Sequence, residues 1–290
     1  MKLIEFILFR TLVLVFSIIP YKVLYFFSNI TYFFIYKLIG YREKIVSQNL
    51  KNSFPEKSDD EILILCKKFY HHLTDITLES IKVMSISKKA IEKKYLIKNT
   101  EILDEYFEKK QSILCLTSHY GNWEYGILET GNKFKHKAIA LYLPLTNKYS
   151  EKYGVKRRSR FGTKLVAVQE SKKIFTEDLD IPKAIILAAD QNPANKEKSI
   201  WVNFLNQDTA CLHGPEAYAK KTNFPVVYFN ISKTKRGFYE LTIEKLIENP
   251  SELEPNKITE IYMKRLEKDI NLKPEYWLWS HRRWKFGRGE

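Results

Sequence analysis

His119 is the residue in this sequence best suited to acid–base chemistry. It lies in the polar stretch 118–124, which directly follows an apolar run at 112–117. Imidazole titrates near neutral pH, so its ring can take a proton from an attacking hydroxyl group and return it to a leaving group. The pattern predicts a general base, and such a base needs a carboxylate to orient its ring.

Two carboxylates compete for that orienting role. Glu124 follows His119 by five positions, and Gly121 between them permits a tight turn. Asp190 follows a second apolar run, at 184–188. Because polar residues at the carboxyl ends of neighbouring strands gather at one edge of a sheet, Asp190 is a rival to Glu124 for this role, and the sequence does not decide between them. Taken alone, the spacing of His119 and Glu124 also fits a loop histidine and an ordinary exposed helix residue.

Runs rich in β-branched and aromatic residues alternate with helical patterns after residue 94. The pattern predicts helices at 124–130 and 258–270, and strands at 112–117, 137–142, 184–188, 225–231 and 239–243. The pattern over 41–94 predicts helix, and the sequence Ser-Asp-Asp-Glu at 58–61 predicts a helix start within it. This alternation predicts an α/β fold with a central, mainly β, sheet flanked by helices.

The first 40 residues are the most apolar part of the chain and are interrupted mainly by Glu5, Arg10, Pro20, Lys22 and Lys37. One interpretation is a tilted helix over about 3–19, and another is a pair of helices broken at Pro20 that lies in the membrane interface. A helical hairpin packed on a soluble domain is the alternative. We expect membrane attachment by residues 1–40 and one catalytic domain over 41–290.

The composition narrows the classes of partner. A net charge of +14 and a pI near 9.4 favour nucleic acid, anionic lipid or an acidic carrier protein. No nucleic-acid-binding motif accompanies the charge, so we expect no nucleic acid partner. Cys66, Cys115 and Cys211 lack the spacing of metal ligands. We therefore expect neither a metal site nor a disulfide framework, and a reducing, cytoplasm-facing location.

The stretch 116–124 resembles the H-x4-D/E block of the lysophospholipid acyltransferase superfamily, and specifically its lipid A biosynthesis (lauroyl/myristoyl) acyltransferase branch. Further segments resemble blocks of that branch, in the same order: 49–56, 142–147, 157–162, 190–191, 204–214 and 277–285. The sequence departs from the pattern at a few positions. Leu143 stands where arginine is common, and Asn206, Thr209 and Cys211 replace the usual small residues after Phe204.

The resemblance implies an acyltransferase with a glycerolphosphate-acyltransferase-like fold at the cytoplasmic face of a bacterial inner membrane. It implies acyl carrier protein as the donor of the acyl group and an anionic glycolipid, a lipid A precursor, as the acceptor, with no cofactor. Another glycolipid or an aminolipid is the alternative acceptor. A non-catalytic protein that binds anionic lipid is the alternative class.

The resemblance also suggests roles for single residues. Arg157 is predicted to stabilise the oxyanion, with Arg160 or the backbone amides after Gly121 as alternatives. The basic run around Arg157 also fits a solvated helix face or a phosphate site. A covalent route through Ser118 or Cys115 has no evident second base. The residues predicted to bind substrate are Asn122, Arg160, Gln191, His281, Arg282 and Arg283.

The C-terminal cluster 281–283 lies among three tryptophans, Trp277, Trp279 and Trp284. Arginine and tryptophan together favour phosphate headgroups or an acidic carrier at a membrane surface. The tryptophans fit a hydrophobic core equally well.

Overall fold

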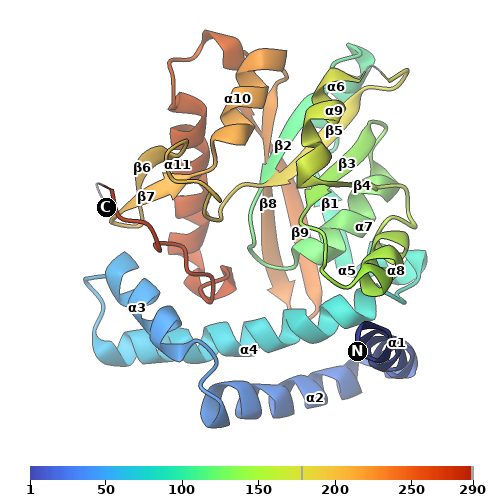
Figure 1. Cartoon of the computed structure of the whole chain (residues 1–290), viewed down its shortest axis with the longest axis vertical. Helices are drawn as coiled ribbons and strands as arrows, with labels where there is room; N and C mark the ends of the chain where they lie inside the picture. Colours follow the sequence, from blue (N-terminus) through green and yellow to red (C-terminus); the bar gives the residue numbers. More distant parts are fainter. Residues whose placement is uncertain (178, 289–290) are drawn as a thin grey trace.

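The computed structural model describes residues 1–177 and 179–288 and has a seven-stranded sheet at its centre (Figure 1). The strands are β1 (Tyr95–Lys98), β2 (Ile113–Thr117), β3 (Lys137–Tyr142), β4 (Lys164–Ala167), β5 (Lys183–Ala188), β8 (Val226–Lys235) and β9 (Phe238–Ile247). Their order is β1-β9-β8-β2-β5-β3-β4. Neighbouring strands are parallel except for β8 and β9. The predicted α/β sheet is confirmed.

Four short strands were not predicted. The edge strands β1 and β4 have only four residues each, too few for a clear alternating pattern. A separate antiparallel pair, β6 (Ile200–Phe204) and β7 (Gln207–Cys211), lies outside the main sheet. It packs against the C-terminal helix α11 (Lys257–Leu272), so it extends the core instead of joining the sheet.

Helices surround the sheet. They are α1 (Lys2–Ile18), α2 (Tyr21–Tyr32), the π-helical η1 (Phe33–Leu38), α3 (Glu43–Ser53), α4 (Asp59–Val83), α5 (Lys88–Lys94), α6 (Glu101–Glu108), α7 (Trp123–Lys133), α8 (Lys148–Arg158), α9 (Ser171–Thr176), α10 (His213–Thr222) and α11, with short 3-10 turns η2 (Val168–Glu170), η3 (Pro250–Glu252) and η4 (Pro274–Tyr276). The predicted start of α4 is confirmed. Ser58 accepts a hydrogen bond from the backbone N–H of Glu61, and the Glu61 carboxylate accepts one from the N–H of Ser58.

The sheet has a hydrophobic core on each face, because successive side chains of a strand point to opposite sides. Leu114 and Leu116 of β2 pack in the core that contains α11, whereas Ile113 and Cys115 pack in the core that contains α7. All four side chains are buried. Burial on both faces explains why β2 reads as a continuous apolar run.

Helix α4 crosses one end of the sheet, and α2 lies alongside α4 (Figure 1). Asp75 of α4 is buried and accepts a hydrogen bond of 2.7 Å from Ser28 of α2. The same carboxylate pairs with Arg236, in the turn between β8 and β9, at 2.6 Å. A buried carboxylate with several donors fixes α2 and the β8–β9 hairpin to one point of α4.

The N-terminal segment forms two helices, and the break falls at Pro20, as one of the two interpretations predicted. Proline fixes its own backbone angle and lacks an N–H, so it ends α1 and begins α2. Large apolar side chains of α1, α2 and η1 face solvent, among them Leu8, Phe26 and Phe34. Over the described ranges no individual helix has the length and apolarity to cross a bilayer. The segments Tyr21–Leu38 and Glu43–Ser53, which are bent by 87° relative to each other, reach that length and apolarity only when taken together.

Lys82 of α4 holds the end of α1. Its ammonium group donates hydrogen bonds to the carbonyl oxygens of Phe16, Ser17 and Ile19, at 2.7, 2.8 and 2.8 Å. The last carbonyls of a helix have no partner within the helix, and a cation also interacts favourably with that end.

We expect Lys82→Met to loosen the end of α1 without unfolding the domain. Losing charge-assisted bonds should cost about 1.5–3 kcal/mol locally, equal to roughly 10- to 100-fold faster exchange of the amides that close α1. Hydrogen exchange measured by mass spectrometry checks this, with the exposed Lys89→Met as the matched control. Equal protection of α1 in both variants would show that Lys82 does not hold the helix.

Candidate functional site

His119 and Asp190 meet at the carboxyl edge of the central sheet. Strands β2 and β5 are parallel neighbours, and their last residues, Thr117 and Ala188, are paired in register. His119 and Asp190 each follow two residues later. The His119 Nδ1 atom lies 2.8 Å from the Asp190 Oδ1 atom, and the backbone N–H of His119 donates to Oδ2 at 3.0 Å. Of the two rival carboxylates, Asp190 is therefore the one bonded to the imidazole ring.

The pair leaves one ring nitrogen of His119 free. With its Nδ1–H donated to Asp190, the ring carries a lone pair on Nε2, and no hydrogen bond from the described residues engages that atom. The side chain of His119 is 23% exposed, whereas that of Asp190 is 2% exposed. The geometry thus presents an imidazole nitrogen at the surface with a buried carboxylate beneath it.

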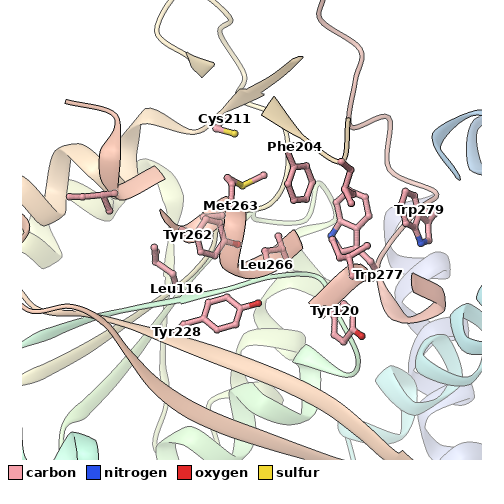
Figure 2. Close-up of a cluster of buried hydrophobic side chains, with 14 of the residues drawn as sticks. Leu116, Tyr120, Phe204, Cys211, Tyr228, Tyr262, Met263, Leu266, Trp277 and Trp279 are labelled. Carbon is pink, nitrogen blue, oxygen red and sulfur yellow. The ribbon is translucent and has the colours of Figure 1, made fainter. Parts of the chain in front are cut away.

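A tryptophan completes the support of Asp190. The indole N–H of Trp277 donates to Asp190 Oδ2 at 2.9 Å. Figure 2 shows the Trp277 ring within a cluster of buried side chains that includes Phe204, Trp279 and Tyr120. The tryptophan thus belongs to the core, as the alternative interpretation held, while its indole nitrogen serves the site. Packing on all sides restricts the ring, so the donor to Asp190 stays in place.

The electrostatics of the pair favour a charged imidazole next to a carboxylate. Burial alone lowers the pKa of His119, but the charge of Asp190 and its hydrogen bond outweigh burial, so the pKa is raised above its ordinary value. Burial raises the pKa of Asp190, but the His119 charge and the bonds from His119 and Trp277 lower it overall. Asp190 therefore stays ionised and stabilises the protonated ring.

We expect Asp190→Asn to lower the pKa of His119, because burial then acts without the opposing negative charge of Asp190. An NMR titration of the carbon-bound imidazole protons measures this pKa. Glu124→Gln is the comparison, and it should lower the pKa less because Glu124 acts on the ring only through its charge. An unchanged pKa in Asp190→Asn would contradict the assignment of the pair.

Glu124 forms an ion pair with Arg158 and makes no hydrogen bond to His119 among the described residues. The two carboxylate oxygens lie 2.9 Å from Nη2 and 2.9 Å from Nε of Arg158. Glu124 is in the first turn of α7 and Arg158 is the last residue of α8. The negative charge of Glu124 also contributes to raising the pKa of His119, after the larger effects of burial and Asp190. Glu124 thus lies close enough to His119 to act on its charge, and it binds Arg158.

The other arginines of the basic run contact the end of α4. Arg157 donates through Nε to the Met84 carbonyl oxygen, and Arg160 donates to the Val83 carbonyl oxygen at 2.9 Å. These bonds satisfy carbonyl groups at a helix C-terminus. The oxyanion role of Arg157 and the substrate role of Arg160 remain predictions. Sequence reasoning missed Arg158, whose only signal was its place in the same run.

Asn122 caps α7 and is buried. Its side-chain oxygen accepts the N–H of Tyr125 at 3.0 Å, and its amide donates to Glu79 at 2.7 Å. Glu79 also accepts the hydroxyl groups of Tyr25 at 2.7 Å and Tyr239 at 2.8 Å. Both ends of the Asn122 amide are thus used within the protein, and its predicted contact with substrate has no support in this geometry. In the sequence Glu79 occupies an ordinary helix position, and no pattern indicates a role for it.

The loop after His119 turns at Gly121, as predicted. Gly121 has φ +61°, and a Cβ there would lie 2.7 Å from a methyl carbon of Ile231. The N–H of Gly121 donates to the Tyr276 carbonyl oxygen at 3.0 Å, and the N–H of Leu278 donates to the His119 carbonyl oxygen at 3.1 Å. The C-terminal segment 276–283 therefore holds the loop that carries His119.

The same segment is fixed on two further sides. Asn49 of α3 donates to the carbonyl oxygens of Trp279 at 2.9 Å and His281 at 3.0 Å. Asn192, two residues after Asp190, donates to the Arg282 carbonyl oxygen at 2.9 Å. Sequence reasoning did not assign Asn49 a role, although the segment 49–56 was one of its motifs. Segment 276–283 thus joins α3 to both loops of the site.

The remaining predicted substrate-binding residues fall into two groups. Arg283 is buried and donates to the Ala210 carbonyl oxygen at 2.6 Å, so its guanidinium faces β7 and its predicted substrate role has no support in this geometry. His281 and Gln191 are partly exposed, and Arg282 is exposed, so these three can meet a ligand. Over the residues that the structure covers, no group of acidic, histidine and cysteine side chains could hold a metal ion.

Comparison with known proteins identifies the family. Residues 2–286 match the family model described as bacterial lipid A biosynthesis acyltransferase. A search of curated proteins finds no match. The match spans nearly the whole chain and includes both loops of the site, so this chain belongs to the bacterial lipid A biosynthesis acyltransferase family and is an acyltransferase of lipid A synthesis.

Proposed function

We propose that this acyltransferase moves a fatty acyl group from acyl carrier protein to a hydroxyl group of a lipid A precursor, with His119 as the general base. The observation that carries the proposal is the His119–Asp190 pair, with Nδ1 bonded to the carboxylate and Nε2 free. This is the arrangement in which an imidazole accepts a proton from a hydroxyl and becomes a stabilised cation.

The steps follow from this geometry. Nε2 of His119 removes the proton of the acceptor hydroxyl while its oxygen attacks the thioester carbonyl carbon. The resulting tetrahedral intermediate collapses, the carbon–sulfur bond breaks, and His119 returns its proton to the leaving thiolate. The products are an ester of the lipid and the free thiol of the carrier.

Direct transfer is supported by the burial of the nearby nucleophiles. Ser118 is 2% exposed and Cys115 is fully buried. Burial also raises the pKa of the Cys115 thiol well above its ordinary value, which disfavours the reactive thiolate. Neither side chain is placed to carry an acyl group, so no covalent intermediate is proposed.

Donors for the oxyanion lie at the start of α7. The free N–H groups at a helix N-terminus favour negative charge, and α7 begins four residues after His119. Arg158, held by Glu124, adds a positive charge at the same place. Arg157, favoured by the sequence, remains a second candidate for this role.

The experiment supplies purified protein with a labelled acyl group on either acyl carrier protein or coenzyme A, and with a lipid A precursor as acceptor. The proposal predicts faster transfer from the carrier protein, detected as labelled lipid on a chromatogram. Faster transfer from coenzyme A would identify acyl coenzyme A as the donor instead. Transfer only to another glycolipid or an aminolipid would identify that lipid as the acceptor. Binding of lipid without any transfer would favour a non-catalytic lipid-binding protein.

We propose that α1, α2 and η1 attach the enzyme to the cytoplasmic face of the bacterial inner membrane. Their exposed apolar side chains suit the acyl boundary of a bilayer. Lys148, Lys152 and Lys156 recur every four residues along α8, which contacts α1, and all three are exposed. Such lysines attract anionic headgroups next to an inserted helix.

We expect the double substitution Leu8→Glu and Phe26→Glu to weaken vesicle binding by about tenfold or more, since each side chain loses roughly 1.5–3 kcal/mol of burial. Co-sedimentation with vesicles of anionic phospholipid measures the binding. Leu272→Glu, at the end of α11 and 76% exposed, is the control. Equal binding by the double variant and the control would rule out attachment through these helices.

A further inference from the structure

A groove lies between α3 and the C-terminal segment, next to the site. It has a volume of about 370 Å³ and is lined by Lys44, Ile45, Gln48, Asn49, Arg282, Trp284 and Lys285, here called the C-terminal groove. A volume above about 300 Å³ is typical of pockets for small molecules. The groove thus has room for a compact group of that size.

The groove is positively charged. Lys44, Arg282 and Lys285 line it and are exposed, and no carboxylate lines it. Within the described part of the chain, none of these three side chains has an ion-pair partner. Three unpaired cations around one hollow attract a ligand that carries concentrated negative charge. Arginine and lysine together are suited to phosphate, because both donate charge-assisted hydrogen bonds to its oxygens.

The groove also contains groups that suit a sugar. Gln48 lies one helical turn after Lys44 and lines the groove; its amide nitrogen donates to Asn52 Oδ1 at 2.7 Å, and no hydrogen bond from the described residues engages its amide oxygen. The Trp284 ring forms part of the wall and is held in place by its N–H, which donates to Thr209 Oγ1 at 2.8 Å. A fixed aromatic ring gives the apolar face of a sugar a surface to lie on, and the amide can bond to its hydroxyl groups.

The position of the groove connects it to the base. Arg282 is anchored through its carbonyl oxygen to Asn192, and Asn192 follows Asp190 by two residues. The backbone N–H of Asn192 also donates to His281 Nε2 at 3.4 Å. A ligand held by Arg282 is therefore next to the loop that orients His119.

We propose that the C-terminal groove binds the phosphorylated saccharide headgroup of the acceptor lipid, with Lys44, Arg282 and Lys285 on a phosphate group and Trp284 against a sugar ring. This inference rests on the proposed function, because it assigns one part of the acceptor to one surface of the enzyme. It also gives Lys44, Gln48, Trp284 and Lys285 roles in selecting the acceptor.

A direct binding test does not depend on catalysis. Calorimetry with a water-soluble glucosamine disaccharide phosphate, without acyl chains, should show binding to wild type that weakens about tenfold or more in the double variant Lys44→Ala, Lys285→Ala. Lys88→Ala, Lys89→Ala on α5 removes the same charge elsewhere and should bind as wild type does. Equal binding by both double variants, or equal binding of the unphosphorylated disaccharide, would overturn the inference.

The kinetic test separates the two substrates. In the double variant Lys44→Ala, Lys285→Ala, KM for the phosphorylated acceptor should rise about tenfold or more. KM for the acyl carrier and kcat should stay near their wild-type values. Removing the phosphate from the acceptor should abolish the difference between the variant and wild type. A rise in KM for the acyl carrier instead would mark the groove as a carrier surface and overturn the inference. If the wild-type protein transfers no acyl group, the proposed function fails. The calorimetric measurement alone then decides whether the groove binds the disaccharide phosphate.

Discussion

His119→Ala is expected to reduce kcat for acyl transfer by about 10²–10⁴-fold, because the reaction loses the group that takes the proton of the attacking hydroxyl. The fold should be retained, since the His119 side chain is partly exposed and its loop is held by backbone bonds to the segment 276–283. Initial rates with saturating donor and acceptor measure the effect.

His213→Ala is the matched control, because this histidine is exposed at the start of α10 and makes no hydrogen bond through its side chain among the described residues. It should keep the wild-type rate. Near-normal activity in His119→Ala would remove the proposed base, and a different group would have to be sought.

Asp190→Asn is expected to reduce kcat by about 10³–10⁴-fold, because an amide cannot stabilise the protonated ring and can favour the wrong tautomer of His119. Glu124→Gln should cause a smaller loss, since Glu124 is bonded to Arg158 and not to the ring. Steady-state rates of the two variants decide between the carboxylates. A greater loss in Glu124→Gln would return the orienting role to Glu124.

The pH dependence gives a second readout of Asp190→Asn. The base must be unprotonated, so kcat/KM should fall as the pH drops through the pKa of His119. In wild type this pKa is raised despite burial, because of Asp190. The acid limb of the variant should therefore move to lower pH. A loss of rate with no movement of the limb would point to structural damage.

Several features of the fold and site were readable in the sequence because they depend on local patterns. The apolar runs before His119 and Asp190 predicted β2 and β5, and the polar residues after them predicted the edge at which the site lies. Gly121 predicted the turn, and Pro20 the break between α1 and α2. Each of these follows from the conformational preferences of a few neighbouring residues.

Other features depend on the order of strands and the phase of helices, which local patterns do not contain. Strand β5 is the neighbour of β2 in the sheet, although β3 and β4 lie between them in the chain. This pairing is a property of the strand order and not of any local pattern. In a helix one residue turns the side chain by roughly 100°, and this separates Arg158, which meets Glu124, from Arg157. Asn49 and Glu79 act on partners far away in the chain, so neither could be assigned from its neighbours.

The most direct test of the central claim is a single-turnover experiment with labelled acyl carrier protein, excess enzyme and the lipid A precursor. Rapid quenching and separation of protein from lipid follow the label with time. Direct transfer with His119 as base predicts that label passes to the lipid at the rate it leaves the carrier, with none on the enzyme, and that His119→Ala slows this single step. Label that accumulates on the enzyme before reaching the lipid, or an unslowed His119→Ala, would contradict the account.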